Sequence, residues 1–158
     1  MWIEVSNMRR PVTGLAACVA ATWLAACGGA AGSPEDEIRA WVRQGTEFVE
    51  AENRRGLVGM ISTAYADGRG NTRDDLDDRF RLVFLRANNI TLLTSIDEIR
   101  LHGDSAADVL LTVGMAGTDG GFLGIDADAY RFEMELERDG GDWQLIGARW
   151  AELGEEMR

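Results

Sequence analysis

The sequence contains no lysine: the sixteen basic residues among its 158 residues are all arginine. A chain without lysine forms no side-chain Schiff base and has no lysine general base. It also lacks the lysine of the phosphate-binding P-loop. The enzyme classes that depend on those groups are therefore excluded.

Cysteine and histidine are nearly absent as well, with two cysteines and one histidine. Cys18 lies in an N-terminal segment that we expect to be removed, and Cys27 lies directly after that segment. The remaining domain therefore has no disulfide, no cysteine nucleophile and no cysteine metal site. With His102 as its only histidine, it has no histidine-rich metal centre either. We expect no metal and no cofactor.

The N-terminal segment has the parts of an export signal. Arg9 and Arg10 form a positive region, residues 12–24 form a short apolar run, and Ala25 and Ala26 supply the small residues that a signal peptidase needs. About thirteen apolar residues are too few to span a hydrocarbon core ~30 Å thick. The pattern therefore predicts a removable signal and not a permanent membrane helix.

We predict that residues 1–26 are a signal peptide. Residues 1–7 fit no part of such a signal, so we expect Met8 to be the natural start and the gene to have been read too far upstream. Loss of residues 1–26 removes one glutamate and two arginines and changes the formal charge from −11 to −12. Such a charge disfavours nucleic acid and other phosphate ligands.

The segment Leu24-Ala25-Ala26-Cys27 resembles the lipobox of bacterial lipoproteins, Leu-(Ala/Ser)-(Gly/Ala)-Cys, at every position. The resemblance implies that Cys27 becomes the first residue of the mature chain and carries lipid on its thiol and its amine. Several acyl chains anchor a protein stably, whereas one binds only marginally. Gly28 stands where an aspartate would retain an enterobacterial lipoprotein at the inner membrane, so the resemblance favours the outer membrane, facing the periplasm. The alternative is an ordinary cleaved signal with a chance cysteine.

After a glycine-rich tether (residues 27–33), three helices are predicted. Ser33 and Pro34 have the residue types that cap and begin a helix, and apolar residues follow at three- and four-residue steps to Val49. A second, short helix is expected over residues 57–61, after an interruption at Gly56. Residues 65–72 form a turn, and Thr72 caps a third helix. The apolar stripe of that helix, which we expect to be core, is Leu76, Phe80, Val83, Phe84 and Ala87.

From Ile90 onward the apolar period becomes strand-like. Residues 90–101 form the first predicted strand, with a bulge marked by Ser95 and Asp97. The other predicted elements are a turn over residues 102–105, a strand over 109–115, a glycine-rich loop over 117–124, a strand over 130–137, a hairpin turn at Asp139-Gly140-Gly141-Asp142 and a last strand over 143–150. Residues 152–158 are expected to fray.

Helices followed by antiparallel strands predict one α+β domain over residues 34–151, with the helices packed on one face of a curved sheet. The order of elements, the Tyr65-Ala66-Asp67 turn and the closing strand from Trp143 to Trp150 resemble the nuclear transport factor 2-like superfamily. The resemblance implies a cone whose sheet curls around a pocket, often in a homodimer formed through the sheet.

The catalytic relatives in that superfamily, of the ketosteroid isomerase and polyketide cyclase type, need a base in an apolar cavity and a hydrogen-bond donor. The nearest candidate for the base is Asp67, and the candidates for the donor are Tyr65 and Tyr130. No catalytic motif of those enzymes matches this sequence residue by residue. An aspartate in a glycine-rich turn ordinarily caps that turn. His102 is interpreted as a turn residue, and Asp126-Ala127-Asp128 does not continue as a calcium loop because Arg131 stands where glycine is needed.

Two hypotheses follow. The leading one is a lipid-anchored, non-catalytic envelope protein that binds a small apolar molecule or another envelope protein, with Tyr65, Tyr130 and Trp150 as candidate ligand-binding residues. The other is an isomerase- or cyclase-type enzyme that uses a pocket carboxylate, and it requires Asp67 to point into a dry pocket. A purely structural role also remains open.

Overall fold

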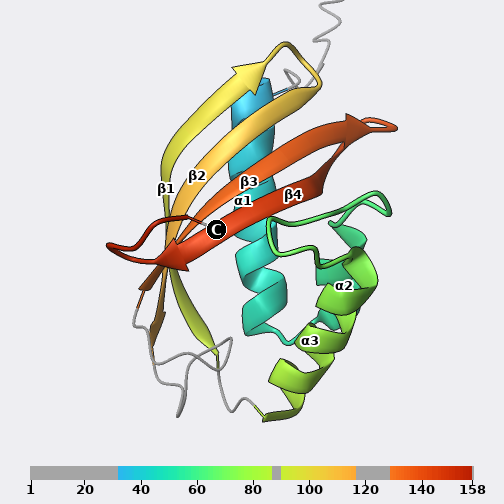
Figure 1. Ribbon diagram of the computed structural model, residues 1–158. Coiled ribbons are helices and arrows are strands. Elements are labelled where there is room, and N and C mark those ends of the chain that lie inside the picture. The colour runs from blue at the N-terminus through green and yellow to red at the C-terminus, as the bar shows by residue number, and fades with distance from the viewer. Residues whose placement is uncertain (1–31, 87–89, 117–128, 158) are drawn as a thin grey trace, which may run out of the picture. The chain divides into compact units, whose positions relative to one another are not determined.

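The computed structural model describes residues 32–86, 90–116 and 129–157, which belong to one compact unit, Gly32–Arg158. Three helices precede four strands (Figure 1). They are α1 (Pro34–Glu50), α2 (Arg54–Gly59), α3 (Arg73–Arg86), β1 (Thr91–His102), β2 (Ala106–Ala116), β3 (Ala129–Asp139) and β4 (Asp142–Glu152). The predicted signal peptide, Cys27, the glycine-rich loop and Asp126-Ala127-Asp128 lie outside the described residues. No helix in the described part is both long enough and apolar enough to cross a membrane.

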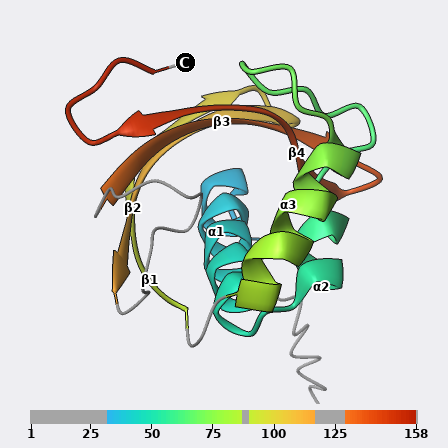
Figure 2. The ribbon, with the colours of Figure 1, turned by 60° about the horizontal axis from the view of Figure 1, so that its bottom comes forward.

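The four strands form one antiparallel sheet in the order β1-β2-β3-β4. The sheet curves around α1, which lies on its concave side, with α2 and α3 beside it (Figure 2). This arrangement confirms the predicted α+β class with helices on one face of a curved antiparallel sheet.

The first helix begins where its capping residues predict. The Ser33 hydroxyl accepts a hydrogen bond from the Asp36 backbone N–H at 3.2 Å, and the Ser33 N–H donates to the Asp36 carboxylate at 3.3 Å. This reciprocal capping box satisfies two backbone donors at the helix start. Ile38, Val42 and Val49 are buried on the face that contacts the sheet and α2.

The second helix begins earlier than predicted. Asn53 caps it through a hydrogen bond of 3.0 Å from the Gly56 N–H to the Asn53 side-chain oxygen. Gly56 is therefore inside α2, and the interruption between the two helices lies at residues 51–53 instead. A Cβ at Gly56 would lie 2.9 Å from the ring of Phe48, so glycine allows α2 to approach α1.

The third helix has the predicted cap but not the predicted burial. The Thr72 hydroxyl donates to the Asp75 carboxylate at 2.7 Å, and the Thr72 N–H donates to the same oxygen at 2.8 Å. These hydrogen bonds lower the pKa of the Asp75 carboxyl, the one from the backbone most. No residue of α3 is buried, so the prediction that its apolar stripe forms core is wrong. Leu76 and Phe80 are half-buried because they line a cavity, as described below; Ala87 lies outside the described residues.

The core follows the dry faces of the strands. One cluster joins Ile38 and Val42 of α1 to Val109, Leu111 and other residues of the sheet. A second cluster comprises Ile61, Tyr65, Tyr130, Ala148 and Trp150. Every buried residue of the described part lies between residues 38 and 151, so the domain carries its own core.

The predicted bulge in the first strand and the predicted hairpin turn before the last strand are both present. The register of β1 against β2 shifts between Ile96 and Glu98, which makes Asp97 the extra residue of a bulge; Ser95 pairs regularly. Gly140 and Gly141 have φ of 61° and 108° in the hairpin turn between β3 and β4, where residues with a side chain are strained. The outer edge of β4 is covered by the chain from Met60 to Gly68.

Candidate functional site

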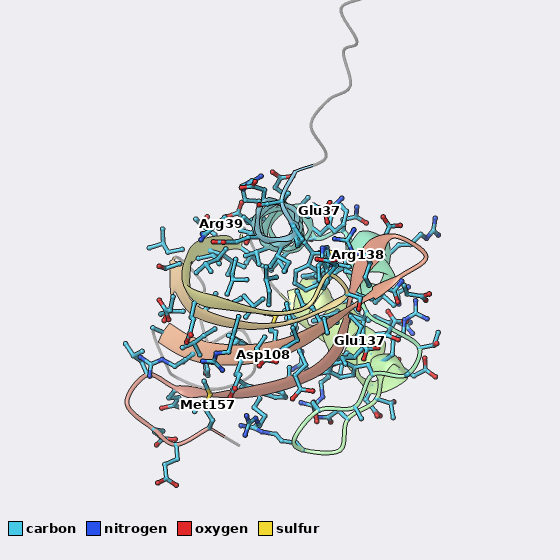
Figure 3. All side chains as sticks on the ribbon, turned by 90° about the horizontal axis from the view of Figure 1, so that it is seen from above. Glu37, Arg39, Asp108, Glu137, Arg138 and Met157 are labelled. Atoms are coloured by element: carbon cyan, nitrogen blue, oxygen red, sulfur yellow. The ribbon has the colours of Figure 1, made fainter. Side chains whose placement is uncertain are left out.

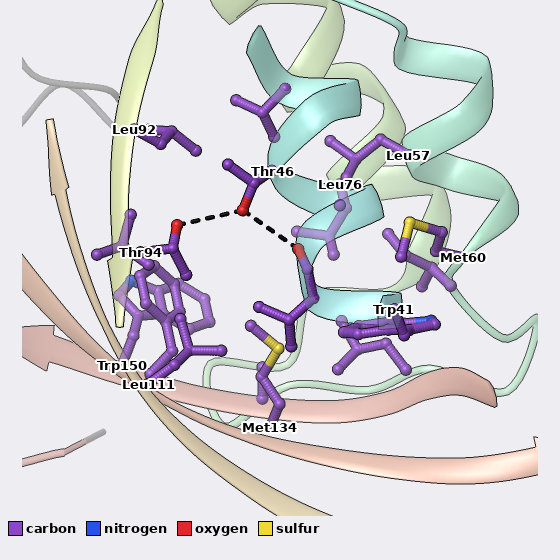
Figure 4. Close-up of a pocket in the computed structure, with 18 of the residues that line it drawn as sticks. Trp41, Thr46, Leu57, Met60, Leu76, Leu92, Thr94, Leu111, Met134 and Trp150 are labelled. Carbon is purple, nitrogen blue, oxygen red and sulfur yellow. Dashed lines mark hydrogen bonds between the residues drawn. The ribbon is translucent and has the colours of Figure 1, made fainter. Parts of the chain in front are cut away.

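A cavity of about 210 Å³ lies between the helices and the concave face of the sheet (Figure 4). Residues of all three helices and all four strands line it, and none of the described lining residues is charged. Six of them are aromatic: Trp41, Tyr65, Phe80, Tyr130, Phe132 and Trp150. An engineered apolar cavity of about 150 Å³ takes up benzene, so this one has room for a somewhat larger apolar molecule.

Two threonine hydroxyls in the cavity wall satisfy each other. The Thr46 hydroxyl on α1 donates to the Val42 carbonyl oxygen at 3.2 Å, and its oxygen lies 3.2 Å from the Thr94 hydroxyl oxygen on β1 (Figure 4). Because the single proton of Thr46 is used by Val42, Thr94 is the donor of the second bond. Neither hydroxyl proton is left for a ligand, and both methyl groups add to the apolar wall.

Tyr65 lines the cavity and is buried, with 3% of its surface exposed. Burial raises the pKa of its phenol far above the usual value of 10.0, and the negative charge of Asp67 together with a hydrogen bond to that carboxylate raises the pKa further. The charge of Arg79 acts in the opposite direction. The phenol is therefore protonated at neutral pH and donates its proton to Asp67.

Asp67 is buried, with 8% of its surface exposed, but it is not among the residues that line the cavity. Its Oδ1 atom accepts hydrogen bonds of 2.8 Å from the backbone N–H groups of Arg69 and Asn71. Its Oδ2 atom accepts one of 2.6 Å from the Asn71 side chain. The carboxylate thus organises the turn, and its oxygens are occupied by protein donors.

The wall beside this turn is a stack of aromatic and cationic groups. The Arg69 guanidinium lies over the Trp150 indole, with Cζ 4.5 Å from the ring centroid, and the Phe132 ring stacks on the same indole at 6.3 Å between centroids. Tyr130 packs against Phe132 at 6.2 Å. A guanidinium at this distance from an indole face is held by a cation–π attraction.

The structure therefore brings together the candidate residues Tyr65, Tyr130 and Trp150 as parts of one cavity, with Asp67 behind Tyr65. Sequence reasoning missed Thr46 and Thr94. A threonine within the apolar face of the first helix was the available signal, but nothing in the sequence indicated that Thr94 would lie opposite it.

His102 is not part of this cavity. It is the last residue of β1 and not a turn residue, and its Nε2 atom lies 2.8 Å from the Asp108 carboxylate on the outer face of the sheet. Ion pairs of Arg100 with Glu98 and of Arg149 with Glu133 share this face. Glu98, Arg100 and Glu133 line a depression together with Asp108 and Met157. Figure 3 shows Asp108 and Met157 on the same side of the sheet. Within the described ranges, no three His, Cys, Asp or Glu side chains form a group that would hold a metal ion.

At the start of α1, the Glu37 carboxylate joins the helix to the hairpin between β3 and β4. One carboxylate oxygen accepts from the Arg138 guanidinium and, at 3.1 Å, from the Trp143 indole N–H. Figure 3 shows Glu37 and Arg138 at this end of the domain. The Arg138 guanidinium also lies 4.8 Å from the Trp143 ring centroid. This cluster fixes the end of the domain at which α1 begins.

Comparison with known proteins identifies the fold. No family model and no curated protein sequence matches this chain. A ketosteroid isomerase-like protein from Erwinia carotovora atroseptica has a similar structure, with a TM-score of 0.60, 13% identity and coverage of 76% of this chain and 96% of that one. An NTF2-like protein from Cytophaga hutchinsonii gives a TM-score of 0.58 at 13% identity, with 75% and 97% covered.

A third similar structure is Bdellovibrio bacteriovorus Bd1075, with a TM-score of 0.58, 12% identity and 74% of this chain covered. The match spans only 41% of that longer protein. Together with the helices on a curved four-stranded sheet, these likenesses show that the domain has the nuclear transport factor 2-like cone fold predicted from the order of its elements.

Proposed function

We propose that this protein is a lipid-anchored envelope protein whose cone binds a small, uncharged, apolar molecule. The observation that carries the proposal is the cavity of about 210 Å³, lined by aromatic and aliphatic side chains with no charged residue among them. A void of this size forfeits packing energy that a filled core would gain, and a bound apolar molecule restores it.

An uncharged ligand fits this cavity better than an anion. An ionised carboxylate or sulfonate loses its hydration on entering an apolar site and finds no cation among the described lining residues. The formal charge of −11 of the whole chain adds long-range repulsion. Fatty acids and other anionic lipids are therefore poor ligands.

The enzymatic alternative, a reaction of the isomerase or cyclase type, is supported by the similarity to a ketosteroid isomerase-like structure and by the placement of Tyr65 in the cavity wall. It requires a base that reaches the ligand. Because Asp67 lies behind Tyr65 and its oxygens accept hydrogen bonds from the turn, we favour binding without catalysis.

The anchor, the outer-membrane location and the periplasmic orientation rest on Leu24-Ala25-Ala26-Cys27 and Gly28. In the full chain expressed in a Gram-negative bacterium, Cys27→Ala is expected to abolish lipid attachment and release the protein from the membrane fraction. Retention of the variant in that fraction, with an unchanged mass, would exclude lipidation at Cys27. Partnership with a second copy or with another envelope protein is compatible with this anchor and is tested by cross-linking in the same cells.

Ligand binding is tested with a matched pair of dyes. N-phenyl-1-naphthylamine is uncharged, and 8-anilinonaphthalene-1-sulfonate has the same ring system with an added sulfonate. For residues 28–158 we expect the uncharged dye to bind with a Kd of roughly 10–200 μM, a range set by typical ligand efficiencies. The sulfonate should bind at least about tenfold more weakly because its charge must be desolvated.

A filling variant shows whether the dye occupies this cavity. Gly45 lies in the wall on α1, and a Cβ there would meet Met60 at 3.5 Å, an ordinary contact distance. Gly45→Leu is expected to occupy the void and abolish dye binding, whereas Gln44→Leu, on the exposed side of the same helix, is expected to leave it unchanged. Equal binding by both variants would place the dye elsewhere and count against the proposal.

A further inference from the structure

The turn that contains Asp67 connects two walls of the cavity. On one side it pairs with the edge of β4: the Ala66 N–H donates to the Ile146 carbonyl oxygen and the Gly68 N–H to that of Ala148, each at 3.1 Å. On the other side, the Arg79 guanidinium of α3 donates to the Asn71 side-chain oxygen at 2.9 Å. The turn is thus attached both to the sheet and to the third helix.

Asp67 holds the centre of this turn. Its hydrogen bonds from the two backbone N–H groups fix Arg69 and Asn71, and the bond from the Asn71 amide orients the side chain that meets Arg79. Hydrogen bonds to an ionised acceptor are stronger than neutral ones, and a buried carboxylate needs them because it is cut off from water. The placement of Arg69 and Asn71 within the turn therefore depends on this one side chain.

Each of the fixed residues supports a different wall. Arg69 lies over the indole of Trp150, which lines the cavity from β4. Asn71 binds Arg79 of α3, the helix that contributes Leu76 and Phe80 to the lining. Among the described elements, the backbone of α3 lies close to α2 and to no strand. The turn is consequently a polar link between α3 and the sheet, in addition to the bond from Arg73 of α3 to the Val58 carbonyl oxygen of α2.

We propose that Asp67 is a positioning residue of the cavity: it sets the separation between Trp150 and the wall formed by α3, and thereby the width of the ligand that the cone accepts. The proposal rests on the binding function proposed above. Asp67 does not itself touch the ligand, since it lies outside the lining. Its effect passes through Arg69 to Trp150 and through Asn71 to Arg79.

The variant Asp67→Asn tests this positioning role, because it keeps the turn formed and weakens the contacts that Asp67 makes within it. The amide oxygen still accepts from the backbone N–H groups of Arg69 and Asn71, but it holds them more weakly because it carries no negative charge. The amide nitrogen, however, accepts no hydrogen bond, so the contact with the Asn71 amide is lost. The turn persists while its connections to both walls loosen.

Asp75→Asn is the matched control. It makes the same carboxylate-to-amide change a few residues along the chain, where one Asp75 oxygen accepts both hydrogen bonds from Thr72 at the start of α3. The amide oxygen still accepts both bonds but without a negative charge, so the variant weakens charge-assisted bonds to the backbone without touching Arg69 or Trp150. Circular dichroism and thermal unfolding establish that both variants remain folded at the temperature of the assays.

The first measurement needs no ligand. Residues 28–158 contain three tryptophans, so their indole N–H signals are resolved by NMR, and Trp150→Phe assigns that of Trp150. We expect the exchange of the Trp150 indole proton with solvent to rise by about tenfold or more in Asp67→Asn, as expected where a local contact no longer restrains opening, and to be unchanged in Asp75→Asn. Unchanged exchange in Asp67→Asn would overturn the proposal.

The second measurement compares two uncharged probes of different width, naphthalene and N-phenyl-1-naphthylamine. The ratio of their Kd values is expected to change by roughly two- to fivefold in Asp67→Asn, the factor that corresponds to loss of the stacking contact on Trp150. The ratio should stay constant in Asp75→Asn. An equal change in both variants would reduce Asp67 to a merely structural residue. Failure of the wild-type protein to bind either probe would refute the proposed function, while the exchange measurement would still decide the role of Asp67.

Discussion

Thr46 of α1 and Thr94 of β1 lie 48 residues apart in sequence, yet their hydroxyl oxygens are 3.2 Å apart in the wall of the cavity. The two hydrogen bonds are donated in the same direction: Thr94 donates to Thr46, and Thr46 donates to the Val42 carbonyl oxygen. The pair joins the central helix to an edge strand without leaving a polar group for the ligand. It is also asymmetric, because removal of one hydroxyl has a different consequence from removal of the other.

This asymmetry predicts unequal stabilities for two isosteric variants. Thr46→Val leaves the Thr94 hydroxyl without its acceptor and should destabilise the domain by about 1–3 kcal/mol, whereas Thr94→Val leaves Thr46 bonded to Val42 and should cost about 0.5–1 kcal/mol. The double variant is expected to be no less stable than Thr46→Val alone. Urea unfolding measures all three, and a Thr94→Val cost equal to that of Thr46→Val would contradict the assigned direction of donation.

Tyr65 predicts a loss of stability at alkaline pH. Burial raises the pKa of its phenol above the unfolded value of 10.0. The folded state therefore keeps the proton where the unfolded state loses it. The resulting stabilisation is complete below pH 10 and disappears above it, with a slope of up to about 1.4 kcal/mol per pH unit. Tyr65→Phe should be less stable than wild type at pH 8 and should show a shallower decline above pH 10. If the stability of wild type and of Tyr65→Phe fell in parallel above pH 10, the alkaline loss of stability would come from other groups.

The fold was predictable to a large extent because its signals are local. The Ser33 cap, the alternation from Tyr130 to Leu136 and the two glycines of the last hairpin act over a few residues each, and the structure has the corresponding elements at those places. The start of α2 was misjudged although its cap, Asn53, is local. The burial of α3, in contrast, depends on distant partners. The apolar stripe of α3 was interpreted as core because a pattern cannot show whether the facing space is filled.

The candidate site was predictable in part for the same reason. Tyr65 and Trp150 were identifiable as pocket residues by their place in the family-like order, and both line the cavity. The contact of Arg69 with Trp150 and the bond from Arg79 to Asn71 join the turn to other elements. Such pairings depend on tertiary geometry, which composition and spacing do not specify.

The two glycines of α2 predict opposite effects of the same substitution. Gly56→Ala places a Cβ 2.9 Å from the Phe48 ring and 2.8 Å from the Asn53 amide nitrogen, so we expect it to destabilise the domain by about 1–3 kcal/mol through overpacking. Gly59→Ala meets nothing within 4 Å and should stabilise the domain by about 0.5–1 kcal/mol through helix propensity. Thermal unfolding of the pair measures both effects; stabilisation by Gly56→Ala would show that Phe48 moves aside freely.

The Glu37 cluster predicts that the shape of the acceptor matters more than its charge. In Glu37→Gln an amide oxygen still accepts from Trp143 and Arg138, so the loss is limited to part of an ion pair whose side chains are 26% and 34% exposed, about 0.5–1 kcal/mol. In Glu37→Ala the buried indole N–H of Trp143 has no acceptor, and we expect a loss of about 2–3 kcal/mol.

The exposed pair of Arg39 and Glu35 on the same helix is the control for this prediction. Glu35→Ala and Glu35→Gln should each change stability by less than about 0.5 kcal/mol, because a solvated pair of this kind contributes little. A salt titration separates the contributions at Glu37: the difference between wild type and Glu37→Gln should shrink at 1 M salt, while that between Glu37→Gln and Glu37→Ala should persist, since a neutral hydrogen bond is not screened. If both differences vanish together at high salt, the cluster stabilises the fold by charge alone, and the indole N–H does not depend on Glu37.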